Sequence, residues 1–151
     1  MVDYEEQRGL SEQPMAGFAP SVESRVAFHR FALVVYGFRC AISGLRFEPS
    51  EGALHDRLEV VLIHPRESEG PLEISNVLVL ESAVARAFGY GHVCVDDSDR
   101  VVIANPEALS DEVRPLVVAG RSLFLPDDPL FRPSRTHLHF HRLVVATYPQ
   151  D

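Results

Sequence analysis

Residues 58–95 constrain the fold more than any other part of the chain. They read LEVVLIHPRESEGPLEISNVLVLESAVARAFGYGHVCV. The nearly continuous apolar run at 58–63 is typical of a buried strand, and Pro65 ends it. After a charged loop, the apolar run at 77–80 predicts a second extended segment, and residues 81–88 are good helix formers. This order predicts an α+β fold with a ββα core.

The segments on either side of this core predict a helix and two hairpins. Residues 22–36 carry apolar side chains at mostly helical spacing, with Ser and Glu candidates for the N-terminal cap, and Gly37 ends the pattern. The sequence RCAISGL at 39–45 contains a Ser-Gly turn signal and predicts a tight hairpin. Two short apolar runs flank the acidic turn at 96–99 and predict a second hairpin.

Two further elements are expected near the C-terminus. Residues 106–120 begin with Pro106 and predict a helix that ends at Gly120 and is kinked or split at Pro115. The last element, SRTHLHFHRLVVATY, fits a strand or a helix, and its Pro-Ser start favours the helix.

Composition limits the function classes. All 14 basic residues are arginine, against 22 acidic residues, and the net charge of −8 argues against strong non-specific DNA binding. The absence of lysine reflects either genomic base composition or a use of arginine for bidentate phosphate contacts. The acidic start of the chain and the lack of an apolar run of roughly 20 residues predict a cytoplasmic protein with no membrane span. Cys40 and Cys94 are far apart and form no zinc-ribbon pair, so both are expected to be buried thiols.

The domain organisation follows from the same patterns. Residues 1–21 show no strand or helix periodicity, and we interpret them as a flexible N-terminal arm. Residues 22–151 are about one domain in length.

Several local signatures occur in the order found in one enzyme family. An aromatic-rich helix leads into RCAISGL, the strand near Pro65 is followed by a loop and Asn76, and the helix ends in Arg-Ala-Phe before Gly91. A Phe-His-Arg triplet follows at 140–142. This ordered set, over residues 25–145, resembles the HNH endonucleases, also called ββα-metal nucleases.

The resemblance implies a metal-dependent nuclease site, and this chain departs from it. The family's strand histidine, a general base, falls on Leu62, and its helix histidine, a metal ligand, falls on Ala85 or, with a one-residue slip, on Val84. The aspartate that follows the helix phenylalanine falls on Gly89, and only Asn76 is retained. Leucine, alanine and glycine neither accept a proton nor bind a metal. The resemblance therefore predicts a vestigial site in which Leu62 and Ala85 are buried and face each other.

Two residues in this region have alternative interpretations. His64 lies two positions beyond Leu62 on the same strand face, about 7 Å further along, so it is a candidate substitute base. Its alternative is an exposed loop histidine beside Pro65. Asn76 is either part of a site or a turn former that hydrogen-bonds nearby backbone. His92 is expected to begin a strand.

The histidine series in the last element is a weak candidate for metal binding. A helix places His137 and His141 on one face and His139 on another, whereas a strand places all three together. The weak metal candidates are therefore His64, His137 and His141. No cofactor is expected unless the chain is active, in which case it needs a divalent ion such as Mg²⁺, Mn²⁺ or Zn²⁺.

Three functions therefore compete. The first is a catalytically inactive HNH-like protein kept as a binding or regulatory module for a protein partner, for a second copy of itself, or weakly for nucleic acid. The second is an active endonuclease that uses His64. The third is an unrelated α+β protein, which a structure without two paired strands and a helix across residues 58–92 would favour.

Overall fold

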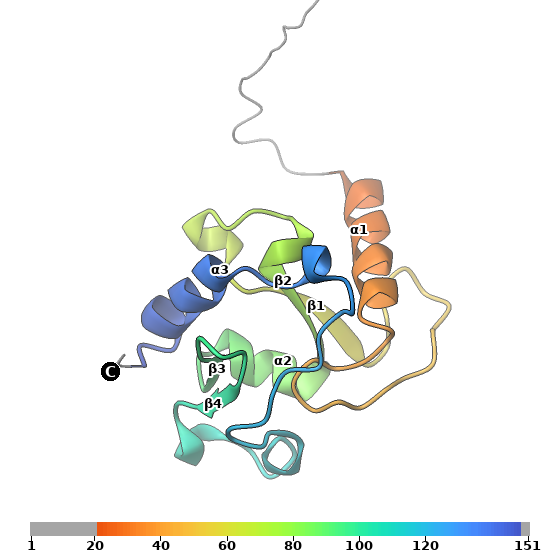
Figure 1. Ribbon diagram of the computed structural model, residues 1–151. Helices are drawn as coiled ribbons and strands as arrows, with labels where there is room; N and C mark the ends of the chain where they lie inside the picture. The colour runs from red at the N-terminus through yellow and green to blue at the C-terminus, as the bar shows by residue number, and fades with distance from the viewer. Residues whose placement is uncertain (1–20, 149–151) are drawn as a thin grey trace, which may run out of the picture.

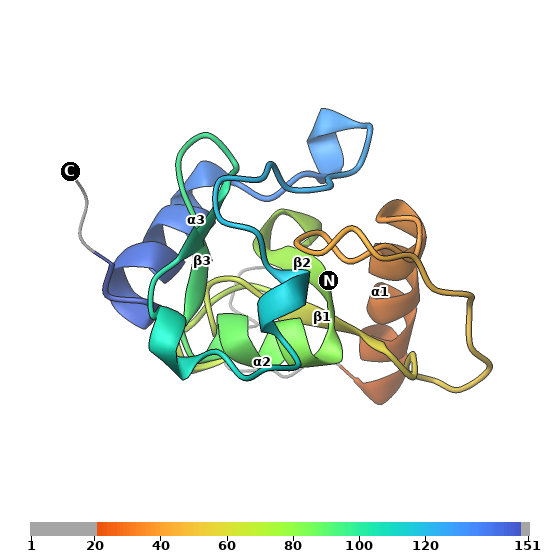
Figure 2. The same ribbon diagram turned by 90° about the horizontal axis from the view of Figure 1, so that it is seen from below.

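The computed structural model describes residues 21–148 and confirms the α+β class. The elements surround two small antiparallel sheets and are shown from two sides in Figures 1 and 2. In chain order they are α1 (Val22–Val35), β1 (Leu58–Leu62), β2 (Val77–Glu81), α2 (Ser82–Gly89), β3 (Val93–Val95), β4 (Val101–Ile103) and α3 (Arg135–Phe140). The predicted residues 1–21 arm lies outside the described residues except for Ser21.

The first sheet and α2 form the ββα unit that the sequence predicts. Strands β1 and β2 pair antiparallel, with Leu58 opposite Glu81 and Leu62 opposite Val77. Every residue of β2 is buried, whereas β1 is partly exposed. Both views place this sheet between α1 and α2, and both helices contact it. The hydrophobic core is continuous across these elements.

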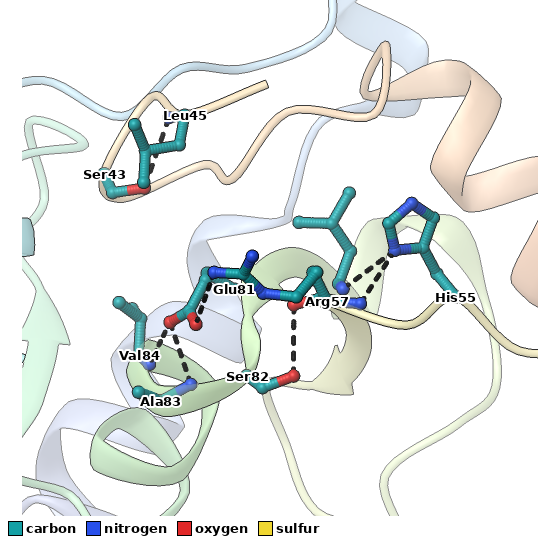
Figure 3. A network of polar contacts seen from close by, with 9 residues as sticks. Ser43, Leu45, His55, Arg57, Glu81, Ser82, Ala83 and Val84 are labelled. Carbon is teal, nitrogen blue, oxygen red and sulfur yellow. Dashed lines mark hydrogen bonds and ion pairs between the residues drawn. The ribbon is translucent and has the colours of Figure 1, made fainter. Parts of the chain in front are cut away.

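A buried carboxylate fixes the start of α2. Glu81 is 5% exposed and ends β2, and its Oε1 accepts hydrogen bonds from the backbone N–H of Ala83 at 2.8 Å and of Val84 at 3.1 Å (Figure 3). These bonds satisfy two of the unpaired amides at the helix start, and the negative charge suits the positive end of the helix dipole. The half-exposed Arg57 guanidinium lies 3.9 Å from the second carboxylate oxygen. Glu81 is thus a cap, which explains why strand passes directly into helix.

The predicted first helix and the turn that follows are confirmed. The Ser21 hydroxyl accepts a hydrogen bond from the Ser24 N–H at the start of α1, and Gly37 adopts φ +65° after its end. That left-handed conformation favours glycine and stops the helix. The turn at 39–45 closes through a bridge between Arg39 and Arg46. The second predicted hairpin is β3–β4.

One predicted helix is wrong. Residues 106–120 form two single 3₁₀ turns, Pro106–Ala108 and Arg114–Leu116, and no α-helix. Pro115 has no N–H to donate to a preceding carbonyl, and the Arg114 side chain donates to the carbonyl of Leu109 instead. A single α-helix, α3, therefore follows β4 within residues 21–148, and it continues as a π-helical turn, His141–Val145. The helical alternative for the last element is correct. Both cysteines are buried free thiols, as predicted.

Candidate functional site

The loop between β1 and β2 is fastened by the amide of Asn76. This residue is fully buried, and its Oδ1 accepts from the backbone N–H of His64 at 2.8 Å. Its Nδ2 donates to the carbonyl of His64 at 3.0 Å and to that of Pro71 at 2.8 Å. Since three backbone groups are paired by one side chain, the loop has one preferred path across the end of the sheet.

His64 lies within this loop with both its backbone and its ring engaged. Its Nε2 lies 2.8 Å from the carbonyl oxygen of Ser68, and its ring stacks on Phe140 with centroids 3.7 Å apart and planes inclined by 15°. A carbonyl oxygen only accepts, so this contact places a ring proton on Nε2, and in the neutral ring the lone pair then lies on Nδ1. The imidazole therefore connects the loop to α3, with one nitrogen able to accept a proton.

His137 approaches the same place from α3. The His64 and His137 rings have centroids 5.9 Å apart, and the Nε2 of His137 lies 3.3 Å from Oε2 of Glu73. Hydrogen bonds from Ser75 and from His137 lower the pKa of the Glu73 carboxyl group. The other ring nitrogen of His137 is buried and has no hydrogen-bond partner among the described residues. The structure thus brings together His64 and His137, two of the three weak metal candidates.

His141 is held elsewhere. It is 2% exposed, its ring stacks on Phe88 with centroids 3.7 Å apart and planes within 2°, and its Nε2 lies 2.8 Å from the carbonyl oxygen of Phe88. Removal from water lowers its pKa to about 4, against the opposing effect of the hydrogen bond. His141 is consequently neutral at pH 7 and joins the π-helical turn after α3 to α2. Over residues 21–148, no group of three or more His, Cys, Asp or Glu side chains is arranged to hold a metal ion.

The positions assigned to the family's other catalytic groups carry no polar side chain, and two of them lie against the hydrophobic core. Leu62 is half-buried and packs on the hydrophobic core, while Ala85 and Val84 are buried on α2. The predicted burial is confirmed for Ala85 and is only partial for Leu62. That the two residues face each other stays a prediction. Gly89 is exposed, and a Cβ atom built there meets no heavy atom within 4 Å. Crowding at the Cβ position therefore does not explain the glycine.

The structural roles of two buried charged residues, Glu81 and Arg142, could not be predicted from the sequence. Glu81 was assigned only to a helix, and Arg142 only to an aromatic-His-Arg triplet. The Arg142 guanidinium is 4% exposed, and it donates to the carbonyl of Val95 at 2.6 Å and to Asp97 at 2.9 Å. It ties the C-terminal helical segment to the β3–β4 hairpin. The triplet was the only available signal, because the partners are more than forty residues away in sequence.

The acidic turn and His92 have local roles. Asp96 Oδ1 accepts from the backbone N–H of Ser98 at 2.8 Å and of Arg100 at 3.0 Å, which builds the turn between β3 and β4. His92 is half-buried directly before β3, and its carbonyl accepts from the N–H groups of Ala104 and Asn105.

One comparison with known proteins, that with solved structures, agrees with a nuclease-like fold. No family model matches the chain, and no curated protein sequence matches it. Among solved structures, the chain is similar to a structure described as the modification-dependent TagI restriction endonuclease, with a TM-score of 0.60 and 20% identity over 90% of this chain. The similarity spans 42% of that enzyme's chain. At this identity the likeness shows the fold alone. No helix among residues 21–148 is long and apolar enough to cross a membrane.

Proposed function

We propose that this protein is a degenerate member of the HNH endonuclease family that no longer cleaves nucleic acid and serves as a cytoplasmic binding or regulatory module. The observation that carries the proposal is the pairing of a kept scaffold with missing chemistry. Asn76 fastens the loop through three hydrogen bonds, while Leu62, Ala85 and Gly89 stand where the resemblance requires a base and metal-binding groups.

In an active nuclease, the base and the metal-binding groups supply much of the acceleration of phosphodiester cleavage. General acid–base catalysis contributes about 10²–10⁴-fold, and a bound metal adds several kcal/mol of charge stabilisation. Apolar side chains supply neither term. Asn76, in contrast, supports the fold whether or not the site is active, so its retention is expected in a binding module.

The charge favours protein over DNA as the partner. A net charge of −8 opposes the phosphate contacts on which non-specific DNA binding depends. We therefore infer that the module binds a protein partner or a second copy of itself, and nucleic acid only weakly. No metal or other cofactor is required for this role.

Two measurements test this proposal. Fluorescence anisotropy with a labelled DNA duplex at 150 mM salt should give a dissociation constant no tighter than the roughly 10⁻⁴–10⁻⁶ M of non-specific binding. Sedimentation velocity on the same sample reports self-association. Nanomolar, sequence-selective duplex binding would contradict the preference for a protein partner.

A second candidate function is an active metal-dependent endonuclease with His64 as the base. The lone pair on Nδ1 of His64 and the nearby ring of His137 favour this alternative, since a general base and a second imidazole nitrogen would then lie side by side. The stacking of His64 on Phe140 opposes it, because a ring used for connection has little freedom to reach a substrate. DNA cleavage that is lost in His64→Ala would support this alternative.

A further inference from the structure

An apolar groove of about 440 Å³ runs beside the first turns of α1. The helix contributes one side, and the loop around residue 54, β1 and the loop before β2 contribute the other. Its apolar lining consists of Val22, Val26, Phe28, Leu54, Val60 and Leu72. This volume lies within the roughly 300–1,000 Å³ of sites that bury a ligand, so the groove has room for a few side chains.

The groove continues the buried stripe of α1 past the end of the core. Val22, Val26 and Leu33 share one helix face by their spacing of four and seven residues, and Leu33 is buried. Towards the start of the helix this face becomes more exposed: Val26 is half-buried and Val22 is 66% exposed. Opposite it, Leu54 is 62% exposed and Leu72 is 41% exposed. Several large apolar side chains exposed together in one groove are typical of a binding surface, whereas isolated ones are ordinary.

We propose that the occupant of this groove is the chain's own segment of residues 10–20, LSEQPMAGFAP, with Met15 and Phe18 as its apolar anchors. The segment joins Ser21, and Val22 already lines the groove. Phe18 is three residues from Ser21 and Met15 is six, so an extended chain carries them up to about 10 Å and 20 Å from that point. Both anchors are within reach of the groove without a long return loop.

Charge and tethering support the same occupant. Residues 10–20 contain Glu12 as their one charged side chain. The described lining includes Arg25 and no carboxylate, so Glu12 meets no like charge there. Because the segment is attached beside the groove, its effective concentration is in the millimolar range, and a weak intrinsic affinity is enough to populate the docked form. This inference concerns a different surface from the vestigial site and holds whether or not the chain is a nuclease.

Hydrogen exchange on the full chain tests the docking. In the wild type, the amides of residues 10–20 should exchange about tenfold more slowly than in Leu54→Asp, which places a charge in the groove. Leu130→Asp is the matched control, since Leu130 is 81% exposed on the Pro129–Phe131 turn outside the groove lining. It should leave the exchange of residues 10–20 unchanged. Unchanged exchange in the fully buried β2 verifies that both variants are folded.

A second variant tests the groove from the side of the segment. Phe18→Ser should speed the exchange of the amides near Leu54 while β2 stays protected. Equal exchange of residues 10–20 in the wild type and in Leu54→Asp would overturn the proposal. Protection that appears only at high protein concentration, together with a dimer mass in sedimentation, would also overturn it by assigning the groove to a second copy of the chain.

Discussion

His141 should make the stability of this protein depend on pH in a predictable way. The folded-state pKa is about 4, below the 6.5 of the unfolded chain, because the ring is buried against Phe88. The unfolded state therefore binds more protons between these values. The stabilising difference is fully present above pH 6.5 and is lost as the pH falls towards 4.

The magnitude follows from the two pKa values. One pKa unit corresponds to 1.36 kcal/mol. Lowering the pH from 7 to 5 should therefore reduce the contribution of His141 to the protein's unfolding free energy by about 2 kcal/mol. The substitution His141→Gln removes the titration and keeps an N–H group that can donate to the carbonyl of Phe88. Urea unfolding followed by circular dichroism should give a pH 7 to pH 5 loss that is smaller by this amount in the variant than in the wild type.

Because the wild type and His141→Gln contain the same carboxylates, the difference between their pH dependences excludes the contribution of these carboxylates. Leu130→Gln is the control because Leu130 is 81% exposed and carries no titrating group, so it should keep the wild-type pH dependence. Equal pH dependence in the wild type and in His141→Gln would refute the reasoning, because it would mean that the folded protein binds a proton at His141 as readily as the unfolded chain does.

Two further predictions concern the fastened loop and the vestigial site. Asn76→Ala should lower the unfolding free energy by about 3 kcal/mol, because three buried hydrogen bonds are worth roughly 1 kcal/mol each. In urea unfolding, the control Ser75→Ala should lower it by less than about 1 kcal/mol. Equal losses in the two variants would contradict the role of Asn76. The double substitution Leu62→His/Ala85→His should create a two-histidine metal site if these positions face each other. Zinc at a hundred times its dissociation constant would then stabilise the variant by about 2.7 kcal/mol, visible as a rise in Tm that neither single variant shows, and the absence of this rise would refute the facing arrangement.

The sequence predicted the ββα unit because local signals bound each of its elements. Pro65 follows the first strand, and the second strand passes into a run of helix formers. The start of α1 was equally readable, since Ser21 has the residue type that caps a helix. In these places the local preference and the fold agree, which is why pattern and structure coincide.

The wrong helix has a local cause, and the missed histidine roles have distant ones. Residues 106–120 have helical composition, but Pro115 and the side chain of Arg114 replace helix hydrogen bonds by turns. The roles of the histidines depend on partners far along the chain: His64 on Phe140, and His141 on Phe88. Spacing within the last element therefore suggested a shared face for His137 and His141, whereas tertiary packing holds them against different neighbours.

The similarity to a restriction endonuclease raises the question that separates the two candidate functions. A scaffold of this fold needs a base and metal-binding groups before it can cleave phosphodiester bonds. The resemblance to HNH endonucleases puts Leu62, Ala85 and Gly89 at the positions of these groups, and His64 and His137 are the nearby imidazoles. The loss of catalysis is therefore the central claim.

Plasmid cleavage by the purified protein tests this claim most directly. Supercoiled DNA is incubated with Mg²⁺, Mn²⁺ or Zn²⁺, and the wild type is compared with His64→Ala purified in the same way. The account predicts no nicking above the level of the His64→Ala sample with any of the three metals. Metal-dependent nicking by the wild type that is lost in His64→Ala would contradict it and would establish His64 as the base of a rebuilt nuclease site.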